Sequence, residues 1–156
     1  MTQVNYRQTI NAPLDDTWAV VGDFGSLLDW VRGGNEGSIE LSGSGPGMLR
    51  DLVLPAVGHV QHRLDVLDDE AHRITYSLTS GKPLGMVEYS VTVRLIPGGE
   101  GTDEDCCTIE WAGEFIAAPD AELEGVADGL EDAYRGMSQL LDELLTRQRT
   151  QRGDES

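Results

Sequence analysis

Hydrophobic residues in the C-terminal part of the chain recur every three or four positions. They are Leu123, Val126, Leu130, Ala133, Tyr134, Met137, Leu140, Leu141, Leu144 and Leu145. This spacing places them on one face of a 3.6-residue repeat, so it predicts one amphipathic helix over 119–149. Gly129 and Gly136 interrupt the pattern, each at a cost of about 1 kcal/mol relative to Ala. That cost points to a bend, or to room for something beside the helix.

Before this helix the hydrophobic residues alternate with a period of two, which is typical of strands. The pattern predicts strands over 36–42, 47–54, 57–67, 72–79, 86–96 and 106–116, and an edge strand over 4–10. Turns rich in Gly, Pro and Asp separate the later strands and favour antiparallel hairpins.

Four of these strands have one apolar face. Its members are Val60, His62, Leu64 and Val66; Ile74, Tyr76 and Leu78; Val87, Tyr89, Val91, Val93 and Leu95; and Cys107, Ile109, Trp111, Gly113 and Phe115. An apolar sheet face must be covered, and the C-terminal helix is the element available to cover it.

Two short helices are expected between the first strand and the rest of the sheet. Pro13 favours the first turn of one of them, with Trp18, Val21 and Phe24 on its buried side, and the second carries Leu27, Leu28 and Trp30. The sequence therefore predicts an α+β fold, with one domain over 1–149 and a polar, disordered tail over 150–156.

The formal charge of −17 excludes several classes of partner. Nucleic acids and anionic membranes bind through Lys and Arg, so we expect neither. The chain has no 18-residue apolar run and no basic, apolar start typical of a signal peptide, so we expect no membrane insertion and a cytoplasmic location. The sequence does not determine the oligomeric state, and a homodimer is compatible with it.

Several kinds of catalytic chemistry lack their usual motifs. Gly-x-Ser-x-Gly, His-Glu-x-x-His and Cys-x-x-Cys do not occur in the chain. Cys106 and Cys107 are neighbours on a predicted strand and point to opposite faces, which suits neither a disulfide nor a zinc site. The only lysine, Lys82, lies in a predicted turn, so a buried Schiff-base amine is not expected. We therefore predict no metal and no cofactor.

Three segments carry a resemblance to a known family. Ile10-Asn11-Ala12-Pro13-Leu14-Asp15-Asp16-Thr17-Trp18 is similar to the Ala-Pro-x-x-x-x-Trp entry of the START-like helix-grip superfamily. Val21-Gly22-Asp23-Phe24-Gly25 followed by Trp30 resembles its bacterial polyketide cyclase/dehydrase and lipid-transport branch. The run from His62 to Glu70 resembles one shared by that branch and the plant abscisic-acid receptors.

The resemblance covers roughly residues 4–145 and implies a curved, seven-stranded antiparallel sheet wrapped around the C-terminal helix. It also implies a cavity between them for a small hydrophobic molecule, with Leu54-Pro55-Ala56 and Lys82-Pro83-Leu84 flanking its mouth. Two positions depart from the relatives. His62 stands where they usually have Glu, and Leu28 stands where the plant receptors have a ligand-binding Lys, so recognition of that hormone's carboxylate is not expected.

The candidate site residues lie on the predicted cavity face. His62, Tyr89 and Tyr76 are the candidate catalytic residues, because a His titrates near neutral pH and a phenol can orient a carbonyl. The candidate ligand-binding residues are Trp30, Arg50, Leu54, Val60, Val91, Trp111, Phe115, Tyr134, Met137 and Leu141. His62 could equally be a core histidine hydrogen-bonded to a tyrosine. The pattern does not decide whether Arg50 points inward.

The function expected from these residues and the resemblance is cofactor-free cyclisation or dehydration of a polyketide-like or aromatic molecule. The alternative is a non-catalytic carrier or sensor of a lipid, isoprenoid or aromatic metabolite. An adaptor that binds partners through its acidic surface is a third class, and only this class requires no small ligand.

Overall fold

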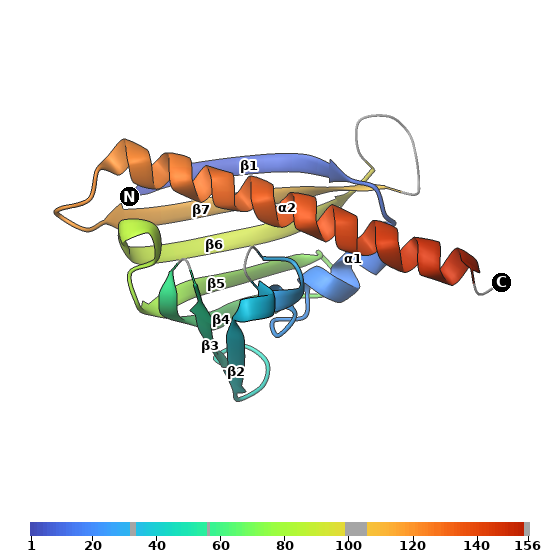
Figure 1. The fold of residues 1–156 in the computed structure, drawn as a ribbon, viewed down its shortest axis with the longest axis horizontal. Coiled ribbons are helices and arrows are strands. Elements are labelled where there is room, and N and C mark those ends of the chain that lie inside the picture. The colour runs from blue at the N-terminus through green and yellow to red at the C-terminus, as the bar shows by residue number, and fades with distance from the viewer. Residues whose placement is uncertain (32–33, 56, 99–105, 155–156) are drawn as a thin grey trace.

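The computed structural model describes residues 1–31, 34–55, 57–98 and 106–154 (Figure 1). The elements are β1 Thr2–Ile10, α1 Leu14–Val21, η1 Leu27–Asp29, η2 Gly34–Glu36, β2 Ser38–Ser42, β3 Leu49–Leu54, β4 Gly58–Asp68, β5 Arg73–Ser80, η3 Pro83–Gly85, β6 Met86–Pro97, β7 Cys107–Ala117 and α2 Leu123–Asp154, where η denotes a short 3-10 helix. No described helix is both long and apolar enough to cross a membrane.

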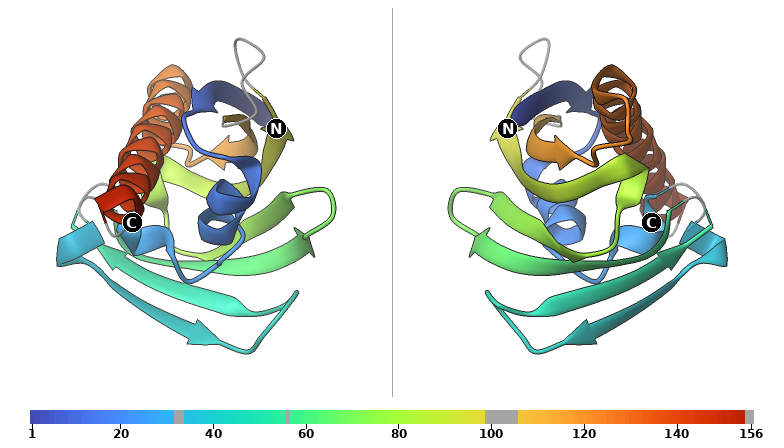
Figure 2. Two further views of the ribbon diagram at one scale, coloured as in Figure 1. Left: turned by 90° about the vertical axis from the view of Figure 1, so that its right-hand side faces the viewer. Right: turned by 90° about the vertical axis from the view of Figure 1, so that its left-hand side faces the viewer.

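The strands form one antiparallel sheet in the order β1-β7-β6-β5-β4-β3-β2. The sheet curls around α1, and α2 lies across its open side (Figure 2). This is the predicted helix-grip fold, and the six predicted strands after the short helices agree with the observed ones to within two residues at each end. The residues predicted to form a disordered tail, 150–156, continue α2 as far as Asp154.

Two predicted inward positions are wrong, and both lie beside a break in strand register. Val66 in β4 and Val87 in β6 are each 37% exposed. The register shifts between Leu64 and Val66 and between Met86 and Glu88. Because an extra residue reverses the alternation of faces, Met86 is buried in place of Val87.

The buried face of α2 includes Val126 and Leu130, and its fully buried residues include Tyr134, Ser138, Leu141 and Leu145. Tyr134 stacks on Trp111 of β7 with ring centroids 4.6 Å apart, and the indole Nε1 of Trp111 donates to Ser138 Oγ at 2.9 Å. These contacts hold the middle of α2 against the sheet.

The packing of the described residues does not require a glycine at position 129 of α2. A Cβ built at Gly129 meets no atom within 4 Å. We therefore expect Gly129→Ala to raise the free energy of unfolding by about 1 kcal/mol, because Ala has the higher helix propensity. Urea denaturation of the wild type and the variant measures this difference.

Gly113 in β7 provides the contrasting variant. A Cβ at this position would overlap the Tyr134 hydroxyl and lie 3.4 Å from Cε1 of Tyr89. Gly113→Ala should lower the free energy of unfolding by roughly 1–3 kcal/mol through overpacking. A destabilised Gly129→Ala protein would show that this glycine has a structural role the packing does not reveal.

Candidate functional site

Five polar side chains from separate elements converge on the inner face of the sheet. Arg50 comes from β3, His62 from β4, Tyr76 from β5, Tyr89 from β6 and Tyr134 from α2. All five are buried. Arg50 lies directly opposite His62 in the β3–β4 register, so the pairing of these strands brings the two side chains together. Four of the five are candidates that the sequence placed on the apolar face; the direction of Arg50 comes from the structure.

Arg50 is a buried cation without a carboxylate partner among the described residues. Its side chain is 3% exposed. One terminal nitrogen donates to the Phe24 carbonyl oxygen at 2.9 Å and the other to His62 Nδ1 at 2.9 Å. The guanidinium carbon also lies 4.0 Å from the Phe24 ring centroid and 4.7 Å from that of Tyr76. Arg50 Nε has no hydrogen-bond partner, so one buried donor remains available to an acceptor.

The contact with Arg50 fixes the protonation state of His62. A guanidinium can only donate, so Nδ1 must accept and the ring proton lies on Nε2. Burial, and secondly the charge of Arg50, lower the pKa of His62 well below its ordinary value. His62 is therefore a neutral imidazole at neutral pH. Its ring also lies 4.9 Å from the Tyr76 ring centroid.

Tyr89 of β6 and Tyr134 of α2 form a second polar pair in the interior. Their hydroxyl oxygens are 2.5 Å apart. Burial raises the pKa of Tyr89 well above its ordinary value, and burial likewise raises the pKa of Tyr134, although the bond between the two phenols acts in the opposite direction on Tyr134. Both phenols are therefore neutral. Only one O–H is needed for their mutual bond, so the second can be donated elsewhere.

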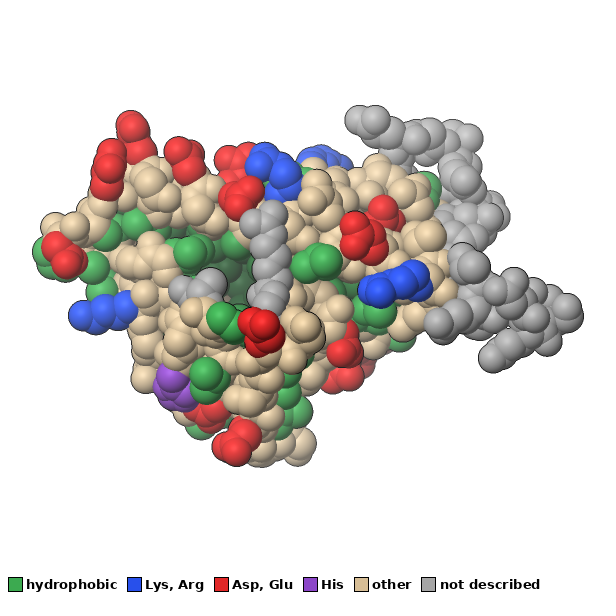
Figure 3. Space-filling model, in the orientation of Figure 1, with side chains coloured by type: hydrophobic (Ala, Val, Ile, Leu, Met, Phe, Trp, Pro, Cys, Tyr) green, Lys and Arg blue, Asp and Glu red, His purple; other side chains and the backbone are tan. Residues whose placement is uncertain are grey.

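The space-filling view shows a hollow between α2 and the elements below it, with hydrophobic side chains on its walls (Figure 3). Asp142 accepts two hydrogen bonds from Asn11, which ties one flank of α2 to the end of β1. The opposite flank carries Met137, Leu140 and Leu144, which are half-buried and packed on the core. At 100° per residue these three lie on the side of α2 that faces the hollow.

The remaining candidates line or support this interior to different degrees. Val60, Val91, Trp111, Phe115 and Leu141 are buried in the core, whereas Met137 is half-buried. Trp30 is buried too, with its Nε1 3.1 Å from Ser26 Oγ and its ring 6.0 Å from Trp111. Leu54 is buried at the end of β3, and Ala56 of the predicted mouth loop lies outside the described residues. Leu84, in the second mouth loop, is 41% exposed with φ of 57°, a conformation strained for leucine.

Three contributors were not among the sequence candidates. Ser138 follows Tyr134 by one helical turn, so the helical period could have placed it on the same face. Gly113 was placed on the inner face, but its role in making room for the Tyr134 phenol depends on packing. The Phe24 carbonyl oxygen could not have been predicted, because every residue has a backbone carbonyl and the residue type does not indicate which one accepts a hydrogen bond.

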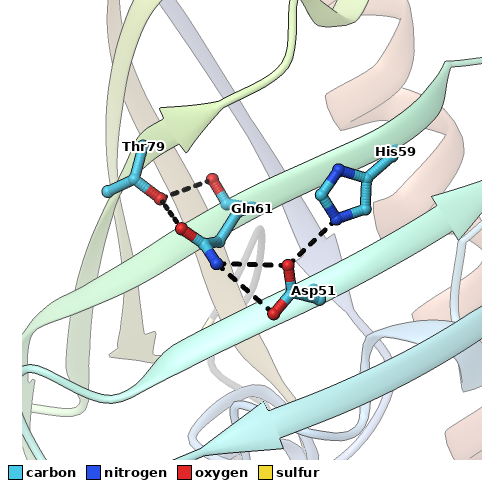
Figure 4. Close-up of polar contacts among 4 residues, drawn as sticks. All are labelled: Asp51, His59, Gln61 and Thr79. Atoms are coloured by element: carbon cyan, nitrogen blue, oxygen red, sulfur yellow. Dashed lines mark hydrogen bonds and ion pairs between the residues drawn. The ribbon is translucent and has the colours of Figure 1, made fainter.

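A second histidine pairs with a carboxylate on the other face of the sheet (Figure 4). His59 Nε2 lies 2.9 Å from Asp51 Oδ1, and Gln61 donates to the same carboxylate at 3.2 Å while its own Oε1 accepts from Thr79. The His59 side chain is 55% exposed. This network therefore faces solvent and is separate from His62. Within the described part of the chain, no group of three or more His, Cys, Asp or Glu could hold a metal ion.

Comparison with known proteins places this architecture in a family. The model of the family described as polyketide cyclase/dehydrase and lipid transport matches residues 1–147. A search of curated proteins finds no match.

Solved structures share the fold at low sequence identity. The protein XoxI from Bacillus cereus has a TM-score of 0.80 and 24% identity, with 94% of this chain and 96% of that chain covered. A Thermobifida fusca protein has a TM-score of 0.72 and 22% identity, with 94% and 95% covered. A point mutant of Thalictrum flavum norcoclaurine synthase in complex with a transition-state analogue has a TM-score of 0.69 and 20% identity, with 95% and 96% covered.

The lowered pKa of His62 makes stability depend on pH. The unfolded chain takes up a proton near pH 6.5 and the folded ring does not, so this group destabilises the fold as the pH falls below about 6.5. Its contribution reaches at most about 1.4 kcal/mol per pH unit and vanishes above that pH. Urea denaturation from about pH 5 to 7 should show a shallower fall in the free energy of unfolding for His62→Gln than for the wild type.

Nitrogen-15 NMR of the imidazole provides the direct check. At pH 7 we expect the chemical shift of Nδ1 to be that of an unprotonated acceptor and the shift of Nε2 to be that of a protonated nitrogen. A ring protonated on both nitrogens at pH 7 would contradict the assignment.

Proposed function

Because this chain belongs to the polyketide cyclase/dehydrase and lipid transport family, we propose that it binds a small polyketide-like or aromatic molecule in the hollow and catalyses its cofactor-free cyclisation or dehydration. The fold and the family both support the binding of a hydrophobic ligand. The observation that carries the catalytic step is Arg50, a buried cation with an unpaired donor and no carboxylate bonded to it within the described residues.

A buried positive charge stabilises an oxygen that becomes negative during a reaction. Several kcal/mol are lost when a charge is removed from water, and an opposite charge at the same site recovers part of that loss. In a poly-β-carbonyl substrate, removal of a proton from a carbon between two carbonyls gives an enolate. The enolate oxygen accepts from Arg50, and the preorganised donor lowers the energy of the transition state that leads to it.

His62 supplies the proton transfers. When the guanidinium of Arg50 turns from Nδ1 to the carbonyl oxygen that will become the enolate oxygen, Nδ1 is free to take the proton from the carbon between the two carbonyls. The enolate carbon then forms the new bond to a second carbonyl carbon, whose oxygen becomes an alkoxide. His62 returns the proton to that alkoxide, which becomes a hydroxyl group. In a dehydration His62 then takes the second proton from the same carbon and gives it to the leaving hydroxyl oxygen, so water is lost as the C–O bond breaks and a C=C bond forms. Tyr76 and one phenol of the Tyr89–Tyr134 pair orient the carbonyls by donating hydrogen bonds.

A carrier or sensor is the second candidate, and the state of His62 without a ligand favours it. Its Nδ1 is already occupied by Arg50, and its lowered pKa makes it a weak base until a substrate displaces that contact. In a carrier the same groups would only fix the orientation of the ligand. The strained loop at Leu84 would move when the ligand enters.

Turnover of a linear poly-β-ketone thioester, followed by mass spectrometry, tests the catalytic proposal. Arg50→Met keeps a long side chain but removes the donors, and we expect it to lower kcat about 10²–10³-fold. His62→Gln should lower kcat about 10²–10⁴-fold. The control is His59→Gln on the outer face, which should retain wild-type turnover. Unchanged turnover in a folded His62→Gln protein would remove its catalytic role.

Native mass spectrometry of the freshly purified protein separates the two candidates. A mixture of a precursor and its cyclised or dehydrated product supports the enzyme. One unaltered metabolite, together with wild-type turnover no faster than buffer, supports the carrier. No retained mass, and no rise in melting temperature with any polyketide-like or aromatic ligand, would contradict both candidates.

A further inference from the structure

A groove of ≈ 600 Å³ lies on the outer face of the sheet, across β1, β7, β6 and β5. We call it the outer groove. Its lining includes Arg7, Arg73, Arg94, Glu110, Thr92 and Ala112. Four of the nine residues that line the groove are charged, and three of these four are arginines.

The arginines of the outer groove form one cross-strand row. The strand register places Arg73 opposite Arg94, Arg94 opposite Glu110, and Glu110 opposite Arg7. The adjacent row pairs Thr92 with Ala112, whose side chains are short. The arginine side chains of the first row are long and the side chains of the adjacent row are short. This difference in length forms the depression between the two rows.

The lining contains three guanidinium groups and one carboxylate, and two of the guanidinium groups contact that carboxylate. Arg94 donates to Glu110 Oε1 at 2.8 Å, and a nitrogen of Arg7 lies 3.6 Å from Oε2, so both carboxylate oxygens are engaged. A terminal nitrogen of Arg73 lies 3.8 Å from Asp68 Oδ2. Like charges directly opposite each other destabilise a sheet. The Arg73–Arg94 pair is therefore an unfavourable arrangement for stability alone, and an added anion would relieve it.

The geometry points to a small organic polyanion as the occupant, and we propose that the outer groove binds a di- or tricarboxylate or a phosphate monoester. A guanidinium presents five donors in a planar fork that matches carboxylate or phosphate oxygens in pairs. The arginine side chains are 47–67% exposed, so their remaining N–H groups are accessible to a ligand.

The charge of the whole chain favours a small anion over an acidic macromolecule. The formal charge is −17, so an acidic protein or nucleic acid would meet repulsion over most of its surface. A small anion inside the groove interacts mainly with charges within one Debye length, about 8 Å at physiological salt. The lining contains three arginines and one acid, Glu110, and Asp68 lies beside Arg73.

Citrate is the probe, and trimethyl citrate is the neutral control with the same skeleton. Each is added to the ¹⁵N-labelled protein at pH 7 in about 20 mM salt. We expect citrate to shift backbone amide signals of β5, β6 and β7 saturably, with Kd at or below about 1 mM, and trimethyl citrate to shift none. Arg94→Gln and Arg73→Gln should each weaken citrate binding at least tenfold.

The matched control is Arg63→Gln, also on the outer face but outside the groove, where Arg63 Nε donates to Asp65 at 2.8 Å. It should bind citrate as the wild type does. Arg73 has no contact with Glu110 in the groove, so its variant tests the site even if Arg94→Gln does not fold. Non-saturating shifts, equal binding by trimethyl citrate, undiminished binding by folded Arg73→Gln, or shifts caused by self-association without citrate would each overturn the proposal.

Discussion

The burial of one positive charge organises the interior of this protein. Arg50 is buried on the inner face of the sheet, and a guanidinium cannot be neutralised there by losing its proton. The surroundings compensate in three ways: a backbone carbonyl from Phe24 accepts one bond, two aromatic faces lie against the cation, and His62 accepts at Nδ1. The compensation is incomplete because Nε has no partner. An interior optimised only for stability would satisfy this donor or replace the arginine with an apolar residue.

Burial and the same charge determine the state of His62. Burial, and secondly the positive charge of Arg50, keep the pKa of His62 low, so His62 stays neutral, and the contact with Arg50 places its proton on Nε2. Tyr89 and Tyr134 are held neutral by burial, which raises the pKa of both. The interior therefore presents one fixed positive charge and several neutral donors, an arrangement suited to an oxygen that carries or develops negative charge.

The two faces of the central strands serve different chemistry because side chains alternate across a sheet. On β5 the inner face carries Tyr76 and the outer face carries Arg73, while on β7 Trp111 supports α2 and Glu110 joins the arginine row. A substitution on one face of the sheet therefore does not directly contact the side chains on the other face. The outer row gives an acidic protein a local excess of positive charge, and the hollow on the other side remains lined by apolar side chains.

The sequence by itself determined the elements and most of their faces, because a 3.6-residue or two-residue period reports directly which side of an element is buried. It identified His62, Tyr76, Tyr89 and Tyr134 as polar groups on an apolar face, and all four meet in the interior. It failed at Val66 and Val87, where a shift in register reverses the alternation and the local pattern does not indicate the shift.

The direction of Arg50 was undecided, because the residues on both sides of β3 include apolar ones. Only the pairing of β3 with β4 set Arg50 opposite His62, and only the packing of Phe24 and Tyr76 around the pair fixed the partners and charge states. Those properties depend on distances between residues far apart in the chain, which local periodicity does not encode.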